Sequence, residues 1–177
     1  PRVAAETEEQ RQKEFTPLVA RTVLWTTALV AIPLVLLSRW IVLLLYSEAF
    51  LPAVGALKAL LVGIVALSAG RVLATDIAGR GFPGLNIFTG LAAVTTNVVL
   101  NLLWIPRYGI VGAAWASTIS YMVSFFGNLF FYCRLSRNPW SEVMFPQWGD
   151  WALYSRVGLA FGRWVKEWIR ERVRRLL

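Results

Sequence analysis

Residues 97–126 read NVVLNLLWIPRYGIVGAAWASTISYMVSFF, and this stretch decides what the chain can be. Asn97 and Asn101 are one helical turn apart in an otherwise apolar run. A proline, two glycines and a series of alanines and serines follow them. Pro106 and Gly109 predict a short turn between two apolar helices.

The helix predicted after this turn repeats small side chains at steps of four residues. Such spacing lets two helix backbones approach closely, so tight helix packing is the interpretation we adopt. The expected packing residues are Gly109, Gly112, Ala113, Ala116 and Ser120.

The composition of the whole chain favours a membrane environment. Of the 177 residues, 57% are hydrophobic and only 16% are charged, whereas soluble domains carry about a quarter charged residues. We therefore predict an all-α, polytopic membrane protein with four transmembrane helices. The apolar runs long enough to span a bilayer are residues 18–37, 51–73, 82–105 and 110–132.

These runs divide the chain into three parts. Residues 1–17 read as a mixed-charge cytoplasmic connector, and residues 18–133 form the transmembrane region. Residues 134–177 form a basic cytoplasmic tail. Within the tail, apolar and basic side chains segregate over residues 157–176, which predicts an interfacial amphipathic helix in contact with membrane lipids.

The positive charges predict the orientation. Fifteen of the 18 Lys and Arg residues fall in residues 1–21, at the end of the second run and in the loop after it, and beyond Tyr132. Because cytoplasmic loops are enriched in Lys and Arg, both termini of the chain are expected in the cytoplasm, with the protein a multi-pass component of the cytoplasmic membrane. Nucleic-acid binding explains the basic excess less well, since the excess follows this topology.

Several kinds of chemistry are excluded by the residue types. The chain has one cysteine and no histidine, which removes disulfide frameworks, Cys/His zinc sites and His-dependent catalytic triads. We therefore expect no catalytic residue, no metal site, no cofactor and no enzymatic activity.

Polar residues inside the predicted spans are the candidate site. Asn86, Asn97 and Asn101 lie at helical spacing on one face of the third span. Lipid offers an amide no partner, so this face should look into protein or a hydrated cavity. Interhelical hydrogen bonding explains each asparagine taken singly, whereas the length of the stripe favours a cavity lining.

Cations give a second set of candidates. Lys58 lies inside the second span, where it either extends to the outer headgroups or faces a cavity. Arg71 and Arg80 lie at the predicted cytoplasmic end, where they also satisfy the positive-inside pattern. Asp76 is a possible partner for either arginine.

The hairpin at residues 97–121 resembles the last two helices of polysaccharide exporters, the O-antigen and capsule flippases of the multidrug/oligosaccharidyl-lipid/polysaccharide superfamily. Their pattern is an Asn-bearing helix followed by Leu-Ile-Pro-x-Tyr-Gly-x-x-Gly-Ala-Ala-x-Ala-Thr-x-x-Ser, and Ser117 stands here where Thr is commoner. Upstream, LLLYSEAFLPAVGALKALLVG and ATDIAGRG resemble two other turns of that family, with Ser47 replacing a usual glycine.

This resemblance implies a function. The chain would be the last four helices, similar to the polysaccharide biosynthesis C-terminal region, of a protein whose two six-helix bundles face a central cavity. The substrate would be a polyprenyl-diphosphate-linked sugar, with Lys58 in the cavity and Arg71 and Arg80 offering paired donors to the diphosphate. The missing N-terminal helices of the same protein would be its partner.

Two alternatives remain open. A multidrug or cation antiporter of the same superfamily would need carboxylates in the spans, and none of the four predicted spans contains Asp or Glu. A non-transporting membrane scaffold or assembly protein would use the small-residue face to hold its partners.

Overall fold

The computed structural model describes residues 2–147 and 150, and the amphipathic helix expected at residues 157–176 lies outside this part. The chain divides into two compact units, Pro1–Met144 and Phe145–Leu177. In the second unit, the backbone amide of Gln147 donates to the carboxylate of Asp150 over 2.9 Å. The fold described below is that of the first unit.

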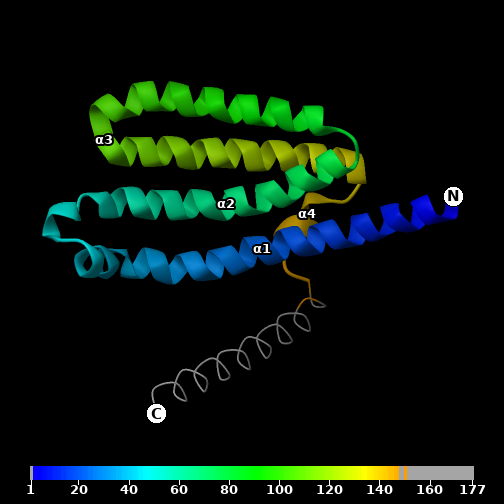
Figure 1. Cartoon of the computed structure of the whole chain (residues 1–177), viewed down its shortest axis with the longest axis horizontal. Coiled ribbons are helices and arrows are strands. Elements are labelled where there is room, and N and C mark those ends of the chain that lie inside the picture. The colour runs from blue at the N-terminus through cyan, green and yellow to red at the C-terminus, as the bar shows by residue number, and fades with distance from the viewer. Residues whose placement is uncertain (1, 148–149, 151–177) are drawn as a thin grey trace, which may run out of the picture. The chain divides into compact units, whose positions relative to one another are not determined.

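The described residues form helices and contain no strand, so the all-α prediction is confirmed for this part of the chain. Figure 1 shows the order of the elements along the chain. They are α1 (Arg2–Leu45), the short 3-10 helix η1 (Glu48–Phe50), α2 (Ala53–Gly79), α3 (Pro83–Ser136) and α4 (Trp140–Met144).

Three helices are long and apolar enough to cross a membrane, judged by length and composition. They are Lys13–Leu45, Ala53–Gly79 and Pro83–Ser136. The sequence predicted four spans, and the difference lies in α3, which contains both of the runs expected at residues 82–105 and 110–132.

The helix α3 folds back on itself at Gly109, whose φ of 56° and ψ of −134° are not helical. Its two arms, residues 83–108 (the first arm) and 110–136 (the second arm), run antiparallel (Figure 1). Thr89 bonds to Asn128, and Asn97 bonds to Ser117 nearer the turn. Both pairs join the two arms on either side of Gly109, and the second pair is nearer the turn, as expected for an antiparallel hairpin.

A Gly109→Ala substitution is expected to destabilise this hairpin by about 1–2 kcal/mol, because a side chain is strained in this region of backbone space. Space is not the cause, since a Cβ at this position would meet nothing within 4 Å. Equilibrium unfolding in mixed micelles measures the loss. Gly90→Ala is the control, because a Cβ there also meets open space but Gly90 has no positive φ. Equal effects of the two substitutions would contradict the explanation.

The first helix joins two predicted parts. As one helix of 44 residues, α1 includes both the connector at residues 1–17 and the first predicted span at 18–37. Pro17 and Pro33 lie inside it, and each removes one backbone donor from the helix. The helix continues because the apolar run extends to Leu45, after which the chain turns through η1. The predicted first span ended at residue 37, so α1 continues eight residues beyond it.

Two glycines of α2 set its close contact with the second arm. A Cβ on Gly63 would lie 2.9 Å from the Cα of Thr118, and one on Gly70 would lie 3.2 Å from the Cα of Phe125. The Thr118 hydroxyl donates to the carbonyl of Ala59 over 2.7 Å at the same contact. Small residues therefore let α2 and α3 approach backbone to backbone.

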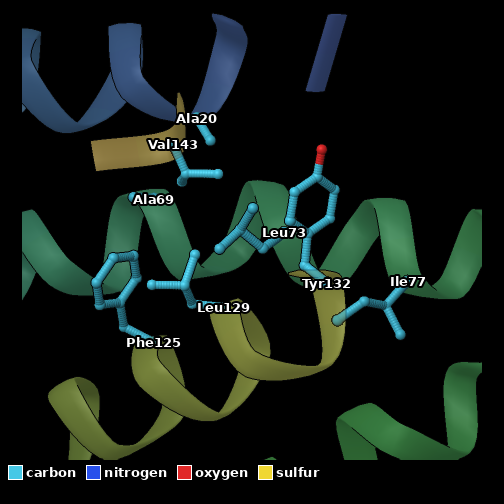
Figure 2. Packing of buried hydrophobic residues seen from close by; sticks show 8 residues of the cluster. All are labelled: Ala20, Ala69, Leu73, Ile77, Phe125, Leu129, Tyr132 and Val143. Carbon is cyan, nitrogen blue, oxygen red and sulfur yellow. The ribbon is translucent and has the colours of Figure 1, made fainter. Parts of the chain in front are cut away.

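An apolar cluster lies beside this contact and brings together α1, α2, the second arm and α4 (Figure 2). Leu73, Tyr132 and Val143 are fully buried in it. The other members are Ala20, Ala69, Ile77, Phe125 and Leu129. The short helix α4 is therefore held to the helices by Val143, although it is only five residues long.

The small residues expected to pack do so unequally. Ala116 and Ser120 are buried, and a Cβ on Gly112 would lie 2.6 Å from the carbonyl oxygen of Trp104 in the first arm. Ala113 is half-buried. Gly109 corrects the expectation, because it is exposed and has no close neighbour. Its role is to reverse the chain.

Candidate functional site

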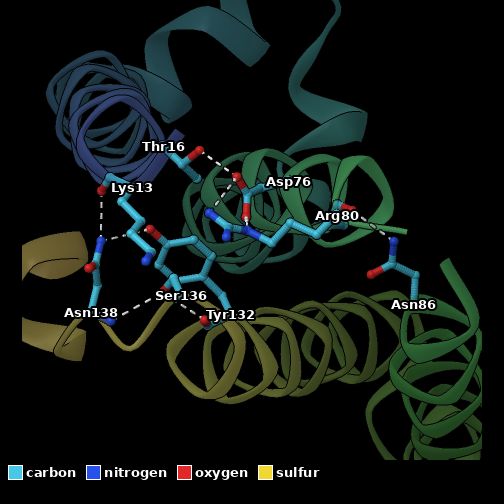
Figure 3. Close-up of polar contacts among 9 residues, drawn as sticks. Lys13, Thr16, Asp76, Arg80, Asn86, Tyr132, Ser136 and Asn138 are labelled. Carbon is cyan, nitrogen blue, oxygen red and sulfur yellow. Dashed lines mark hydrogen bonds and ion pairs between the residues drawn. The ribbon is translucent and has the colours of Figure 1, made fainter. Parts of the chain in front are cut away.

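One predicted cation, Arg80, is already engaged in an ion pair. It binds Asp76 one helical turn earlier on α2, and the two side chains are only 9% and 5% exposed, respectively. The hydroxyl of Thr16 in α1 donates to the same carboxylate over 2.7 Å (Figure 3). Residues four apart share a helix face, so Asp76 pairs with Arg80 and leaves Arg71 without it.

The ion pair belongs to a larger group of polar contacts, which we call the terminal cluster: Thr16, Asp76, Arg80, Tyr132 and Asn138 (Figure 3). The Asn138 amide donates to the carbonyl of Lys13 over 2.7 Å and to the Tyr132 hydroxyl over 3.2 Å. These contacts connect α1, α2 and the segment after α3. The terminal cluster therefore holds these helices together, and Asp76 occupies the Nε and Nη2 groups of Arg80.

The sequence predicted no carboxylate in the second span, but α2 is longer than that span and includes one. The predicted second span ended at residue 73, whereas α2 continues to Gly79 and so includes Asp76. Since Arg80 neutralises this carboxylate, it is not a free ion ligand.

A polar cavity of about 220 Å³ lies between α2 and the two arms of α3. Apolar walls come from Leu67 and Phe125. The polar residues that line it are Arg71, Asn86, Thr89, Ser124 and Asn128. This cavity is the candidate site, because it gathers polar side chains from three helical segments that are otherwise apolar.

Some polar side chains of the cavity wall form hydrogen bonds with each other or with backbone carbonyls. The Thr89 hydroxyl donates to the Asn128 amide oxygen over 2.8 Å, and the Asn128 amide group donates to the Gly70 carbonyl over 3.3 Å. The Asn86 amide group donates to the carbonyl of Ala74 over 2.8 Å. These bonds join both arms of α3 to α2, so they fix the shape of the cavity.

Three other polar groups of the cavity have no hydrogen-bond partner among the described residues. The amide oxygen of Asn86 is buried and accepts no hydrogen bond in the described part of the chain. The Arg71 guanidinium and the Ser124 hydroxyl likewise bond to none of the described residues. Arg71 lies eight residues before the end of α2, which is roughly 12 Å along the helix. The cavity therefore presents one cation, one acceptor and one hydroxyl.

The other two predicted asparagines lie in the hairpin rather than in the cavity. Asn97 donates to the Ser117 hydroxyl over 3.4 Å, and Asn101 donates to the Asn97 amide oxygen over 2.9 Å. Asn101 also lines a separate pocket on the first arm, and its own amide oxygen has no partner among the described residues. The stripe thus splits into one cavity residue, Asn86, and two residues of the hairpin contact.

Lys58 is exposed on α2 and does not line the polar cavity. The structure therefore brings together only two of the six predicted site residues, Arg71 and Asn86. Sequence reasoning missed Asn128, Thr89 and Ser124 as lining residues. Asn128 could have been predicted from the sequence, because it is an amide within an apolar run, as Asn97 and Asn101 are.

No group of three or more His, Cys, Asp or Glu side chains able to hold a metal ion occurs among the described residues. The cavity residues instead offer hydrogen bonds and one positive charge. A scan of protein-family models, a search of curated proteins and a search of solved structures each found no match to this chain.

Proposed function

We propose that this chain is the C-terminal part of a membrane transporter that moves a lipid-linked oligosaccharide across the cytoplasmic membrane. The observation that carries the proposal is the polar cavity. It places the Arg71 guanidinium and the Asn86 amide oxygen, neither of them bonded to another described residue, between helices apolar enough to cross a membrane.

Such groups are costly inside a membrane. A charged side chain costs about 2.5–3.5 kcal/mol at the bilayer centre on insertion scales and less toward the surface, and ionisable residues in spans usually mark a cavity or a substrate path. A sugar chain offers hydroxyls to the amide and the serine, and its phosphate or acidic groups match the guanidinium. The resemblance of residues 97–121 to polysaccharide exporters supports the same class of cargo.

The proposal includes a topology of four crossings. Each arm of α3 is roughly 40 Å long at 1.5 Å per residue, which exceeds the hydrocarbon core of about 30 Å. The excess of Lys and Arg then assigns both termini to the cytoplasm. In this orientation Arg71 lies in the cytoplasmic half of the membrane, where a lipid-linked substrate is loaded, and the remaining helices of the native protein complete the pathway.

An Arg71→Gln substitution in the native-length protein is expected to slow transport about tenfold or more, because it removes charge-assisted hydrogen bonds to the cargo. The measurement is the transfer of a lipid-linked oligosaccharide between leaflets of proteoliposomes. Arg107→Gln is the matched control, since Arg107 is exposed at the hairpin turn and outside the cavity. A native protein that transfers no lipid-linked sugar would overturn the proposal and leave a scaffold role.

A further inference from the structure

The three unsatisfied groups of the polar cavity define what a ligand must offer. The Arg71 guanidinium only donates, and it binds a planar anion best through two parallel hydrogen bonds. The Asn86 amide oxygen only accepts, so its partner must carry a donor. The Ser124 hydroxyl can do either. A ligand that forms hydrogen bonds with all three side chains must be a small molecule that carries both an anionic group and hydroxyl groups.

The charge of the cavity limits the anion. Among the polar residues that line it, Arg71 is the only cation and there is no carboxylate. Arg71 is exposed at the edge of the cavity, and its single guanidinium pairs best with a planar group of one negative charge. A carboxylate meets this condition, whereas a phosphate monoester carries about −1.5 to −2 near neutral pH and would remain partly uncompensated.

The volume of the cavity limits the size of the ligand. Its 220 Å³ correspond to roughly seven water molecules at about 30 Å³ each, which is close to the volume of one sugar ring. Leu67 and Phe125 supply apolar walls for the C–H faces of such a ring. The bonds from Thr89 to Asn128 and from Asn128 to Gly70 hold the polar part of the wall in place.

We propose that the polar cavity is a subsite for a single acidic sugar residue, a hexuronate. Its carboxylate binds Arg71, and its ring hydroxyls donate to the Asn86 amide oxygen and bond to Ser124. This inference rests on the proposed function and refines it, because it names the class of oligosaccharide that the transporter prefers.

The test uses saturation-transfer NMR on the native-length protein in lipid nanodiscs, with glucuronate, glucose and inorganic phosphate as probes. Glucuronate is expected to bind at least about tenfold more tightly than glucose, because only glucuronate forms the charged hydrogen bonds. Arg71→Gln should reduce glucuronate binding to the level of glucose, and Arg107→Gln should leave it unchanged. Asn86→Asp places a negative charge beside the site and should weaken glucuronate more than glucose.

Equal binding of glucuronate and glucose would overturn the inference. So would displacement of glucuronate by an equal concentration of phosphate, which would assign the cavity to a phosphate group. The transfer assay separates the two proposals. Transfer of lipid-linked sugars without glucuronate binding would reject the acidic-sugar subsite alone, whereas glucuronate binding without transfer would reject the transporter.

Discussion

Replacing Arg80 by leucine is expected to destabilise the protein by about 3–5 kcal/mol, because the substitution leaves Asp76 as an uncompensated buried charge. The two side chains are almost fully covered, so water cannot replace the lost partner without opening the terminal cluster. The hydroxyl of Thr16 still donates to Asp76, but one neutral hydrogen bond does not balance a carboxylate. Equilibrium unfolding in mixed micelles measures the free energy of unfolding.

A double substitution distinguishes this cause from general damage. Asp76→Leu combined with Arg80→Leu removes both charges, and replacing a whole buried pair by apolar residues is often close to neutral. The double variant is therefore expected to be more stable than Arg80→Leu alone, which a double-mutant cycle quantifies. Arg107→Leu, at an exposed site, should have little effect. A double variant less stable than the single one would show that the side chains matter for packing rather than for charge.

Replacing Gly63 by alanine is expected to cost about 3 kcal/mol. The new Cβ would lie 2.9 Å from the Cα of Thr118 and 3.0 Å from the ring of Tyr121. Because the nearest atom belongs to the backbone, α2 and the second arm must move apart, and overpacking of this kind costs about 1–3 kcal/mol. The separation also weakens the bond from Thr118 to the Ala59 carbonyl, which adds roughly 1 kcal/mol.

Gly79→Ala is the matched control, because it lies in the same helix and a Cβ there would meet nothing within 4 Å. Alanine is the better helix former by about 1 kcal/mol, so this variant should be neutral or slightly more stable. Thermal unfolding of both variants in the same detergent gives the comparison. Equal losses would mean that the contact between α2 and the second arm is looser than described.

The apolar runs and turn residues of the sequence predicted most of the helical layout. Runs of about 20 apolar residues located α1, α2 and the two arms of α3, and IPRYG located the reversal at Gly109. The boundaries were less predictable, because helices continue beyond the apolar run wherever backbone hydrogen bonds remain favourable. The extension of α2 to Gly79 is the clearest example, since it added Asp76 to the helix.

The candidate site was less predictable because it depends on the angle at which helices meet. Periodicity placed Asn86, Asn97 and Asn101 on one face, but only Asn86 lies level with Arg71 and Asn128 once the hairpin packs on α2. The pairing of Asp76 with Arg80 was within reach of the sequence, because residues four apart share a face and residues five apart do not. Gly63 and Gly70 allow the second arm to pack closely on α2. No sequence motif distinguishes them from the other glycines of α2, so this contact was not predictable from the sequence.

The polar bonds between the two arms of α3 have a consequence for how the protein is made. The first arm carries Thr89 and Asn97, whose side-chain partners, Asn128 and Ser117, are synthesised 39 and 20 residues later, respectively. A first arm released alone into lipid would expose amides without partners. On the proposed topology of four crossings, we therefore expect the two arms to enter the bilayer together, because each arm supplies polar partners for the other.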